Sequence, residues 1–182
     1  MSSLSWNYQG LGFPWNVRFL EDVVRQERPT FIFLCETLSR KSKLEYIRNK
    51  LGFEGLFVVD PRGRSEGLAM LWKDQDQIRI HSFSHYHIDV DVEMDGLGSW
   101  HLTALVDGFK DALSDAGLID MDIFGHQYTW KYSRGKSDWV EVRLDRAVVT
   151  EKWLNEYPMA KLYNLEGSTS DHSPIILVPK KI

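Results

Sequence analysis

A short apolar run that ends at a carboxylate constrains this chain more than any other sequence feature. Residues 30–35, Thr-Phe-Ile-Phe-Leu-Cys, are almost continuously apolar, and Glu36 follows them. A run of this kind predicts a strand that is buried on both faces. Upstream, residues 4–7 predict a short strand, and residues 16–28 predict a helix that Pro29 ends. Strand, helix and strand in this order indicate an α/β fold.

The middle of the chain predicts short strands separated by turns, which favours an antiparallel meander. After a helix at 42–51, the strands are expected at 56–59, 68–72, 78–81, 88–92 and 100–106. Further helices are expected at 108–117 and 150–155, and further strands at 128–130, 142–149 and 175–178. No linker divides the chain, so residues 1–182 are expected to form one domain.

Charge and composition exclude several classes of protein. The chain has 22 Lys and Arg against 26 Asp and Glu, a net charge of −4, whereas proteins that bind nucleic acid non-specifically are usually basic. Residues 131–146 hold five basic and three acidic side chains, which makes Arg143 and Arg146 candidates for binding an anion. Cys35 is the only cysteine, which excludes an internal disulfide and favours a reducing compartment.

No apolar run reaches the length that crosses a bilayer, and the first residues lack the basic patch and apolar core of a secretory signal. These features predict an intracellular protein, in the cytoplasm or the nucleus. Neither secretion nor a membrane partner is expected.

Polar side chains at the ends of predicted strands are candidates for chemistry. Asn7 and Glu36 stand at the C-terminal ends of strands, where ligand sites of α/β sheets gather, and their oxygens suit a hard divalent cation. Asp171 and His172 precede the last strand and could supply an orienting carboxylate and a general acid or base. Asp145 lies within an apolar strand, where a carboxylate needs a partner such as His172. The alternative is that each is a turn residue, a cap or a surface charge.

Four motifs in a fixed order resemble the endonuclease/exonuclease/phosphatase superfamily. They are Ser-Trp-Asn-Tyr-Gln-Gly-Leu-Gly at 5–12, Pro-Thr-Phe-Ile-Phe-Leu-Cys-Glu-Thr at 29–37, Arg-Leu-Asp-Arg at 143–146 and Ser-Asp-His-Ser-Pro at 170–174. The chain is most similar to the plant form that occurs as the endonuclease domain of long-interspersed-element retrotransposons. The resemblance implies a shortened, DNase I-like four-layer α/β/β/α sandwich with two mainly antiparallel sheets. It also implies a hydrolase that cleaves phosphoester bonds with Mg²⁺ or Mn²⁺.

The resemblance implies a role for each matching residue. Glu36 is expected to be the principal metal ligand, with Asp171 near the metal. Asn7 is expected to contact the scissile phosphate or a metal-bound water, on the same side of the cleft as Glu36. His172 is expected to contact the phosphate or to move a proton. Asp145 is expected to orient and polarise His172 through a hydrogen bond.

One motif of the superfamily is absent from this chain. Its Gly-Asp-Phe-Asn segment, which positions the attacking water, stands between a strand and a helix that are here joined directly. The missing piece is a helix plus a strand, roughly thirty residues or more, so a deletion near 106–108 is expected. Glu66 stands where relatives usually have glycine, and it is either an ordinary loop residue or an auxiliary acid at the site.

These observations leave three functions open. The first is a metal-dependent phosphoester hydrolase with a small phosphorylated or diphosphate substrate, which the acidic charge favours over long DNA. The second is a catalytically impaired remnant that binds a ligand or a partner, and the third is a weak endonuclease acting on nucleic acid. The lost strand also predicts a homodimer, because a second copy could cover the backbone groups that it left unpaired.

Two further sets of residues have competing interpretations. His81, His85 and His87 share a face of an extended strand and could bind zinc, but only Asp89 stands near them as a further ligand. The aromatic residues could stack on bases, but most lie in predicted strands, so core packing is expected for them.

Overall fold

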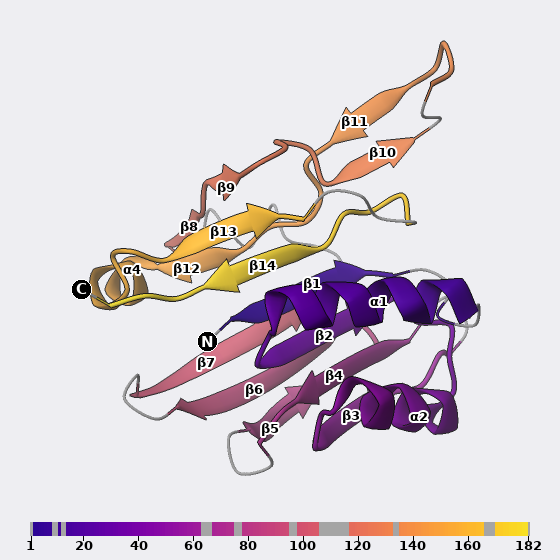
Figure 1. Cartoon of the computed structure of the whole chain (residues 1–182). Helices are drawn as coiled ribbons and strands as arrows, with labels where there is room; N and C mark the ends of the chain where they lie inside the picture. Colours follow the sequence, from indigo (N-terminus) through magenta and orange to yellow (C-terminus); the bar gives the residue numbers. More distant parts are fainter. Residues whose placement is uncertain are drawn as a thin grey trace. The chain divides into compact units, whose positions relative to one another are not determined.

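Strand β2 (Phe31–Cys35) is the apolar run on which the α/β prediction rests, and all five of its side chains are buried. The computed structural model describes residues 2–8, 11, 14–62, 67–74, 78–94, 98–105, 117–132, 135–165 and 170–181. The chain divides into two units: unit 1 is Met1–Asn7 with Gly108–Ile182, and unit 2 is Tyr8–Asp107. Figure 1 shows the helices and strands of each. The single domain with a deletion near 106–108 stays a prediction, because residues 106–116 lie outside the described part.

In its described residues, unit 2 contains two antiparallel sheets and two helices, which Figure 1 labels. Its elements are α1 (Pro14–Glu27), β2, α2 (Lys41–Leu51), β3 (Gly55–Val59), β4 (Leu68–Trp72), β5 (Ile78–Phe83), β6 (His87–Met94) and β7 (Gly98–Leu105). In one sheet β4 lies between β3 and β2, and in the other β6 lies between β5 and β7. The antiparallel meander predicted for the middle of the chain is confirmed by strands β5 to β7.

A hydrophobic core joins the two sheets of unit 2. Its buried side chains on the two facing surfaces include Phe31, Phe33, Met70, Ile88, Val90 and Val92. Because side chains alternate along a strand, Ile32 and Leu34 point to the other face of β2, and they are equally buried. Helices α1 and α2 bury apolar side chains that include Leu20 and Ile47, and α2 packs against β3. No helix in the described residues is long and apolar enough to cross a membrane.

Unit 1 is built around a sheet in the order β1-β14-β13-β9. Its elements are β1 (Ser3–Asn7), β8 (Leu118–Asp120), β9 (Ile123–Phe124), β10 (Trp130–Tyr132), β11 (Val140–Val142), β12 (Val148–Thr150), α4 (Glu151–Glu156), β13 (Lys161–Asn164) and β14 (Ile175–Val178). Strand β14 is antiparallel to β1 and to β13, whereas β9 runs parallel to β13. Strands β10 and β11 pair with each other, and so do β12 and β8. Met121, Ile123, Leu162, Ile175 and Leu177 belong to one core cluster.

Two strand predictions in unit 1 are wrong in detail. The predicted strand 142–149 breaks into β11 and β12, with residues 143–147 outside any strand. The reason is local: the backbone N–H groups of Leu144 and Asp145 donate to the side chain of Thr129. The predicted strand at 128–130 begins only at Trp130. The helix predicted at 108–117 falls almost wholly on residues outside the described part.

Candidate active site

A hydrogen bond joins the two residues that the sequence predicted to act as a pair. Nδ1 of His172 lies 2.8 Å from Oδ2 of Asp145, and the two side chains are only 12% and 18% exposed. A partly buried carboxylate beside an imidazole fixes the orientation of the ring and favours the tautomer with the proton on Nδ1. The expected contact between His172 and Asp145 is therefore present within unit 1.

Thr129 holds the two segments that carry this pair. Its buried hydroxyl accepts the backbone N–H groups of Leu144, at 3.1 Å, and Asp145, at 2.9 Å. Its backbone carbonyl accepts the N–H of Ser173 at 2.7 Å, one residue beyond His172. A single threonine thus connects the segment before β12 with the segment before β14. No local sequence pattern indicates this role, because the role depends on contacts between residues that are distant in the chain.

Asn7, the last residue of β1, completes a chain of contacts around the imidazole. Its Nδ2 lies 3.3 Å from Nε2 of His172, and Trp6 donates its indole N–H to the carbonyl of His172 at 3.1 Å. The amide nitrogen can only donate, so in this arrangement Nε2 accepts and Nδ1 carries the proton directed at Asp145. We call these three residues the Asn7–His172–Asp145 relay.

The carboxylate of Asp171 is held on both of its oxygens. The indole N–H of Trp130 donates to Oδ2 at 3.0 Å. The hydroxyl of Ser170 lies 3.2 Å from Oδ1 and 3.2 Å from the backbone carbonyl of Asn7, so its single proton is shared between these two acceptors. The oxygen of the same hydroxyl accepts the N–H of His172. Asp171 is exposed, so its other lone pairs are available to a ligand. Four of the predicted site residues, Asn7, Asp145, Asp171 and His172, therefore come together in unit 1.

The two arginines predicted to bind an anion contact a carboxylate of their own chain. Arg143 donates to Oδ1 of Asp120 at 3.1 Å, and Arg146 donates to Oδ2 of the same side chain. Arg146 also reaches the backbone carbonyl of Arg143 at 3.2 Å. Asp120 therefore neutralises part of the positive charge of both guanidinium groups, and their binding of an external anion stays a prediction.

Glu36 lies in unit 2, directly after β2, and its backbone is in the left-handed region with φ 54°. A residue other than glycine adopts this conformation at a cost, and such conformations concentrate at functional sites. The next residue, Thr37, is buried and donates its N–H to the carbonyl of Gly67. We expect Glu36 and Asn7 to lie on the same side of a cleft, and this stays a prediction. Glu66 lies outside the described residues.

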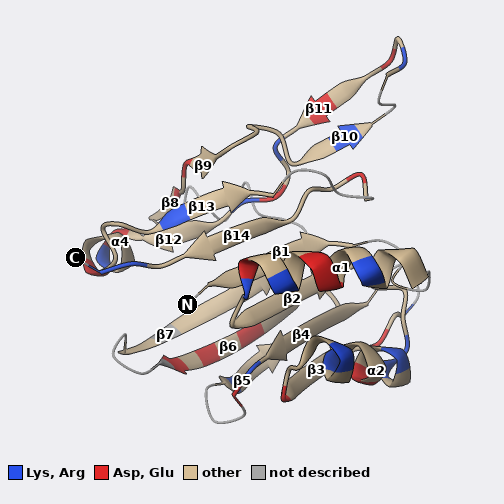
Figure 2. Ribbon diagram, in the orientation of Figure 1, with Lys and Arg blue, Asp and Glu red and all other residues tan. Residues whose placement is uncertain are grey.

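Strands β5 to β7 carry histidine and acidic side chains that contact one another, and the acidic residues on β6 are red in Figure 2. His101 is 2.7 Å from Asp89 and 2.8 Å from Asp91, whereas His81 is 3.9 Å from Asp91. The hydrogen bond with Asp91 raises the pKa of His101, and the hydrogen bond with His101 lowers the pKa of Asp91. His87 faces Ser82 and Ser84 instead. Among the described residues, no three His, Cys, Asp or Glu side chains form a group that could hold a metal.

The expectation that aromatic residues pack in the core is wrong for the β10–β11 hairpin. Tyr132 and Trp139 are about half exposed, and Tyr128, just before β10, is also exposed. The ring of Trp130 stacks on Tyr132, with centroids 5.9 Å apart and planes at 15°, and it lies 6.5 Å from the ring of His172. A two-stranded hairpin has no second layer within itself, so its aromatic side chains remain open to solvent.

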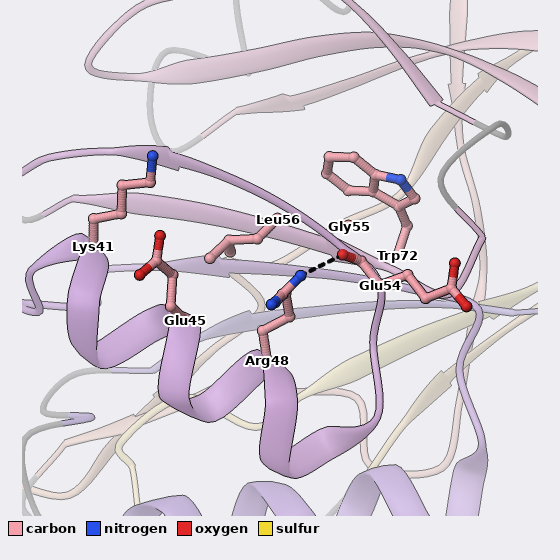
Figure 3. A pocket seen from close by; sticks show the side chains of 7 residues that line it. All are labelled: Lys41, Glu45, Arg48, Glu54, Gly55, Leu56 and Trp72. Atoms are coloured by element: carbon pink, nitrogen blue, oxygen red, sulfur yellow. Dashed lines mark hydrogen bonds between the residues drawn. The ribbon is translucent and has the colours of Figure 1, made fainter.

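A separate pocket of about 360 Å³ lies in unit 2, between α2 and the start of β3 (Figure 3). Its lining is Lys41, Glu45, Arg48, Glu54, Gly55, Leu56 and Trp72. Arg48 donates to the backbone carbonyl of Glu54 at 2.6 Å, as the dashed line in Figure 3 marks. Two cations and two carboxylates balance in charge, and none of the predicted site residues lines this pocket.

Solved structures share the fold although their sequences have diverged. The AP endonuclease LMAP from Leishmania major aligns with 100% of this chain and 88% of its own, at 13% identity and a TM-score of 0.73. The 3′ phosphatase NExo from Neisseria, bound to a product DNA hairpin, aligns over 99% of both chains at 14% identity and a TM-score of 0.71. The endonuclease domain of TRAS1, a telomere-specific non-LTR retrotransposon, aligns over 98% of this chain and 97% of its own, at 12% identity and a TM-score of 0.66. No protein-family profile and no curated protein matches the sequence.

These likenesses define the class of fold. The chain has a mixed α/β fold of the DNase I-like kind, as in endonucleases and phosphatases of the endonuclease/exonuclease/phosphatase superfamily. The fold class predicted from the four sequence motifs is therefore confirmed. Because one fold hosts many activities, the function must be argued from the site itself.

Proposed function

We propose that this chain is a divalent-metal-dependent phosphoester hydrolase in which His172 is the acid–base group. The observation that carries the proposal is the Asn7–His172–Asp145 relay, in which both imidazole nitrogens have polar partners. The fold supports the reaction class, because the similar solved structures include two endonucleases and a phosphatase.

The relay suits proton transfer or phosphate binding. A neutral imidazole with its lone pair on Nε2 can take a proton from the attacking water, and Asp145 then stabilises the imidazolium. Once protonated, the same Nε2 can donate to a phosphate oxygen. The amide of Asn7 lies beside Nε2 and can donate to a non-bridging oxygen of the same phosphate.

The oxygens of Asp171 suit a hard cation such as Mg²⁺ or Mn²⁺, because this carboxylate is exposed. Glu36, in unit 2, is the carboxylate that the resemblance implies as the principal ligand. When bound, the cation supplies positive charge that stabilises the non-bridging phosphate oxygens. The role of Glu36 as ligand rests on the resemblance and on its left-handed backbone conformation.

The proposed substrate is a phosphate ester that carries a planar ring, either a nucleotide or a nucleic acid. The exposed Tyr132 and the Trp130 ring that stacks on it offer a flat aromatic surface in the same unit as His172. Base stacking on aromatic side chains tolerates any sequence. The net charge of −4 favours the smaller of these substrates, because long DNA repels an acidic protein.

A substrate panel tests the proposed hydrolase. Product release is measured from mononucleotides, isoprenoid diphosphates, and single-stranded and double-stranded oligonucleotides, with Mg²⁺, with Mn²⁺ and with EDTA. We expect turnover that requires the cation and is lost in His172→Ala, with Glu151→Gln in α4 as the matched surface control. Equal rates with Mg²⁺ and EDTA would contradict the proposal. Binding without turnover by the unmodified chain would identify a remnant that acts as a binding module.

We also propose that the protein is a homodimer. In the described residues β7 is an end strand of its sheet, hydrogen-bonded to β6 on one side. An end strand presents unpaired backbone groups, and a second copy can cover them by strand addition. Light scattering at micromolar concentration measures the mass, and a value of 21.2 kDa would contradict the dimer.

A further inference from the structure

Asp171 receives one hydrogen bond from a sequence neighbour and one from a distant residue. Ser170, which donates to Oδ1, is adjacent in the chain and moves with Asp171. Trp130, which donates to Oδ2 at 3.0 Å, is separated from it by 41 residues. Of the two side-chain donors, the indole is therefore the one that ties the carboxylate to a different strand.

The backbone around Trp130 is itself fastened to the Asp171 segment. Trp130 and His172 form an antiparallel β-bridge. On either side of this bridge, Lys131 donates its N–H to the carbonyl of Asp171 at 3.0 Å, and Ser173 donates to the carbonyl of Thr129 at 2.7 Å. Because these bonds fix the two backbones, the indole reaches Asp171 from a defined position.

The face of the Trp130 indole also contacts another aromatic ring. It stacks on Tyr132 with planes at 15°, and its centroid lies 6.5 Å from that of His172. A ring that is fixed at its backbone and on one face loses little further entropy when its N–H donates. Packing alone does not require the N–H, since a benzothiophene ring has nearly the same shape as an indole and lacks that donor.

We infer that Trp130 is a positioning residue whose indole N–H holds the carboxylate of Asp171 in one rotamer beside His172. The effect on turnover rests on the proposed hydrolase function, whereas the effect on the rotamer does not. A hydrogen bond to a charged oxygen is stronger than one between neutral groups, so its loss should be visible at the site. The N–H of the indole would then act on the substrate only through Asp171, apart from any contact that the ring itself makes.

Replacing the indole N–H alone tests this inference. The shape of Trp130 is kept, and its donor removed, by incorporating 3-benzothienylalanine at position 130; Trp130→Phe is the genetically encoded counterpart. Trp139→Phe, in an exposed tryptophan of the same hairpin region, is the matched control. Three-bond couplings from the Asp171 carboxyl carbon to its backbone nitrogen and carbonyl carbon report the χ1 rotamer.

We expect the unmodified protein to show the couplings of a single Asp171 rotamer, and both Trp130 variants to show averaged couplings. The indole ¹H–¹⁵N signal that disappears in Trp130→Phe should also move in Asp171→Ala. On the best substrate, kcat should fall about tenfold with KM unchanged, the loss expected for one charge-assisted hydrogen bond. Trp139→Phe should leave the couplings and kcat as they are.

A single Asp171 rotamer in both Trp130 variants would overturn the inference, and so would an indole signal that Asp171→Ala does not move. If the rotamer averages but kcat is unchanged, Trp130 does not act on catalysis and the positioning role is wrong. If the unmodified protein turns over no substrate, the hydrolase proposal fails, while the couplings still decide whether the indole orders Asp171.

Discussion

The hydroxyl of Thr129 accepts the backbone N–H of Asp145 at 2.9 Å inside unit 1, where Thr129 has no exposed surface. This bond turns residues 143–147 away from a regular ladder and presents the Asp145 carboxylate to His172. The geometry of the relay therefore depends on a side chain that does not touch the imidazole.

Thr129→Val should lower the free energy of unfolding by about 1–3 kcal/mol, because two backbone N–H groups lose their acceptor in a buried position. Thr129→Ser keeps the acceptor, so its free energy of unfolding should fall by only about 1 kcal/mol, because a buried methyl group is missing. Urea unfolding at neutral pH measures both variants. A valine variant as stable as the unmodified protein would show that the hydroxyl does not hold this segment.

Asp145→Asn and His172→Ala should each reduce kcat by about 10²–10⁴-fold, the range for loss of a general acid or base and its orienting partner. The melting temperature should change far less, because neither side chain belongs to a hydrophobic core cluster. Steady-state kinetics and thermal unfolding on the same preparations separate the two effects. Rates that remain within twofold of the unmodified protein would exclude His172 from the chemistry.

Glu36 should show a conflict between stability and function. With φ 54°, a residue with a side chain is strained, and glycine is not. Glu36→Gly should therefore be about 1 kcal/mol more stable than Glu36→Ala, while both lose cation-dependent turnover. Chemical unfolding compares the two variants, and product release with Mg²⁺ measures the activity. Equal stability of Gly and Ala would mean that the backbone here relaxes after substitution.

His101 should make the stability of unit 2 depend on pH. Its pKa is raised above 6.5 by the hydrogen bond with Asp91, so its contribution is complete below pH 6.5 and is lost as pH rises through the raised pKa. The pKa of Asp91 is lowered below 3.8 by the same bond, so that contribution is present above pH 3.8 and is lost in acid. Urea unfolding at pH 5.5 and 8.5 should show lower stability at the higher pH, and His101→Gln should flatten this difference. If His101→Gln keeps the full pH dependence of stability, groups other than His101 cause it.

Much of the fold could be predicted because its signals are local. The continuous apolar run of β2 has both faces buried, and α2 ends at Gly52, whose φ of 71° is the left-handed C-cap that glycine favours. Strand β13 was missed, because its alternation of exposed and buried residues is only four residues long. The break at 143–147 was missed as well, since the bonds to Thr129 come from another part of the chain.

The motifs predicted which polar residues form the site, but they did not predict most of the contacts that hold these residues in place. The contact of His172 with Asp145 followed from the resemblance, and the structure contains it. The role of Trp130 could not be seen, because it requires the bridge between Trp130 and His172. The contacts of Arg143 with Asp120 likewise join residues whose proximity the sequence does not encode locally.

Strand β1 pairs with β14, Ser3 opposite Leu177, so the beginning of the chain finds its partner near residue 177. Asn7 stands at the end of β1, and His172 comes just before β14. During synthesis, which runs at about 5–20 residues per second, Asn7 leaves the ribosome well before His172 does. A polypeptide that stops before β14 lacks His172 or its strand, so it cannot assemble the relay. Activity would then begin only after residues 172–178 have been synthesised and have paired with β1.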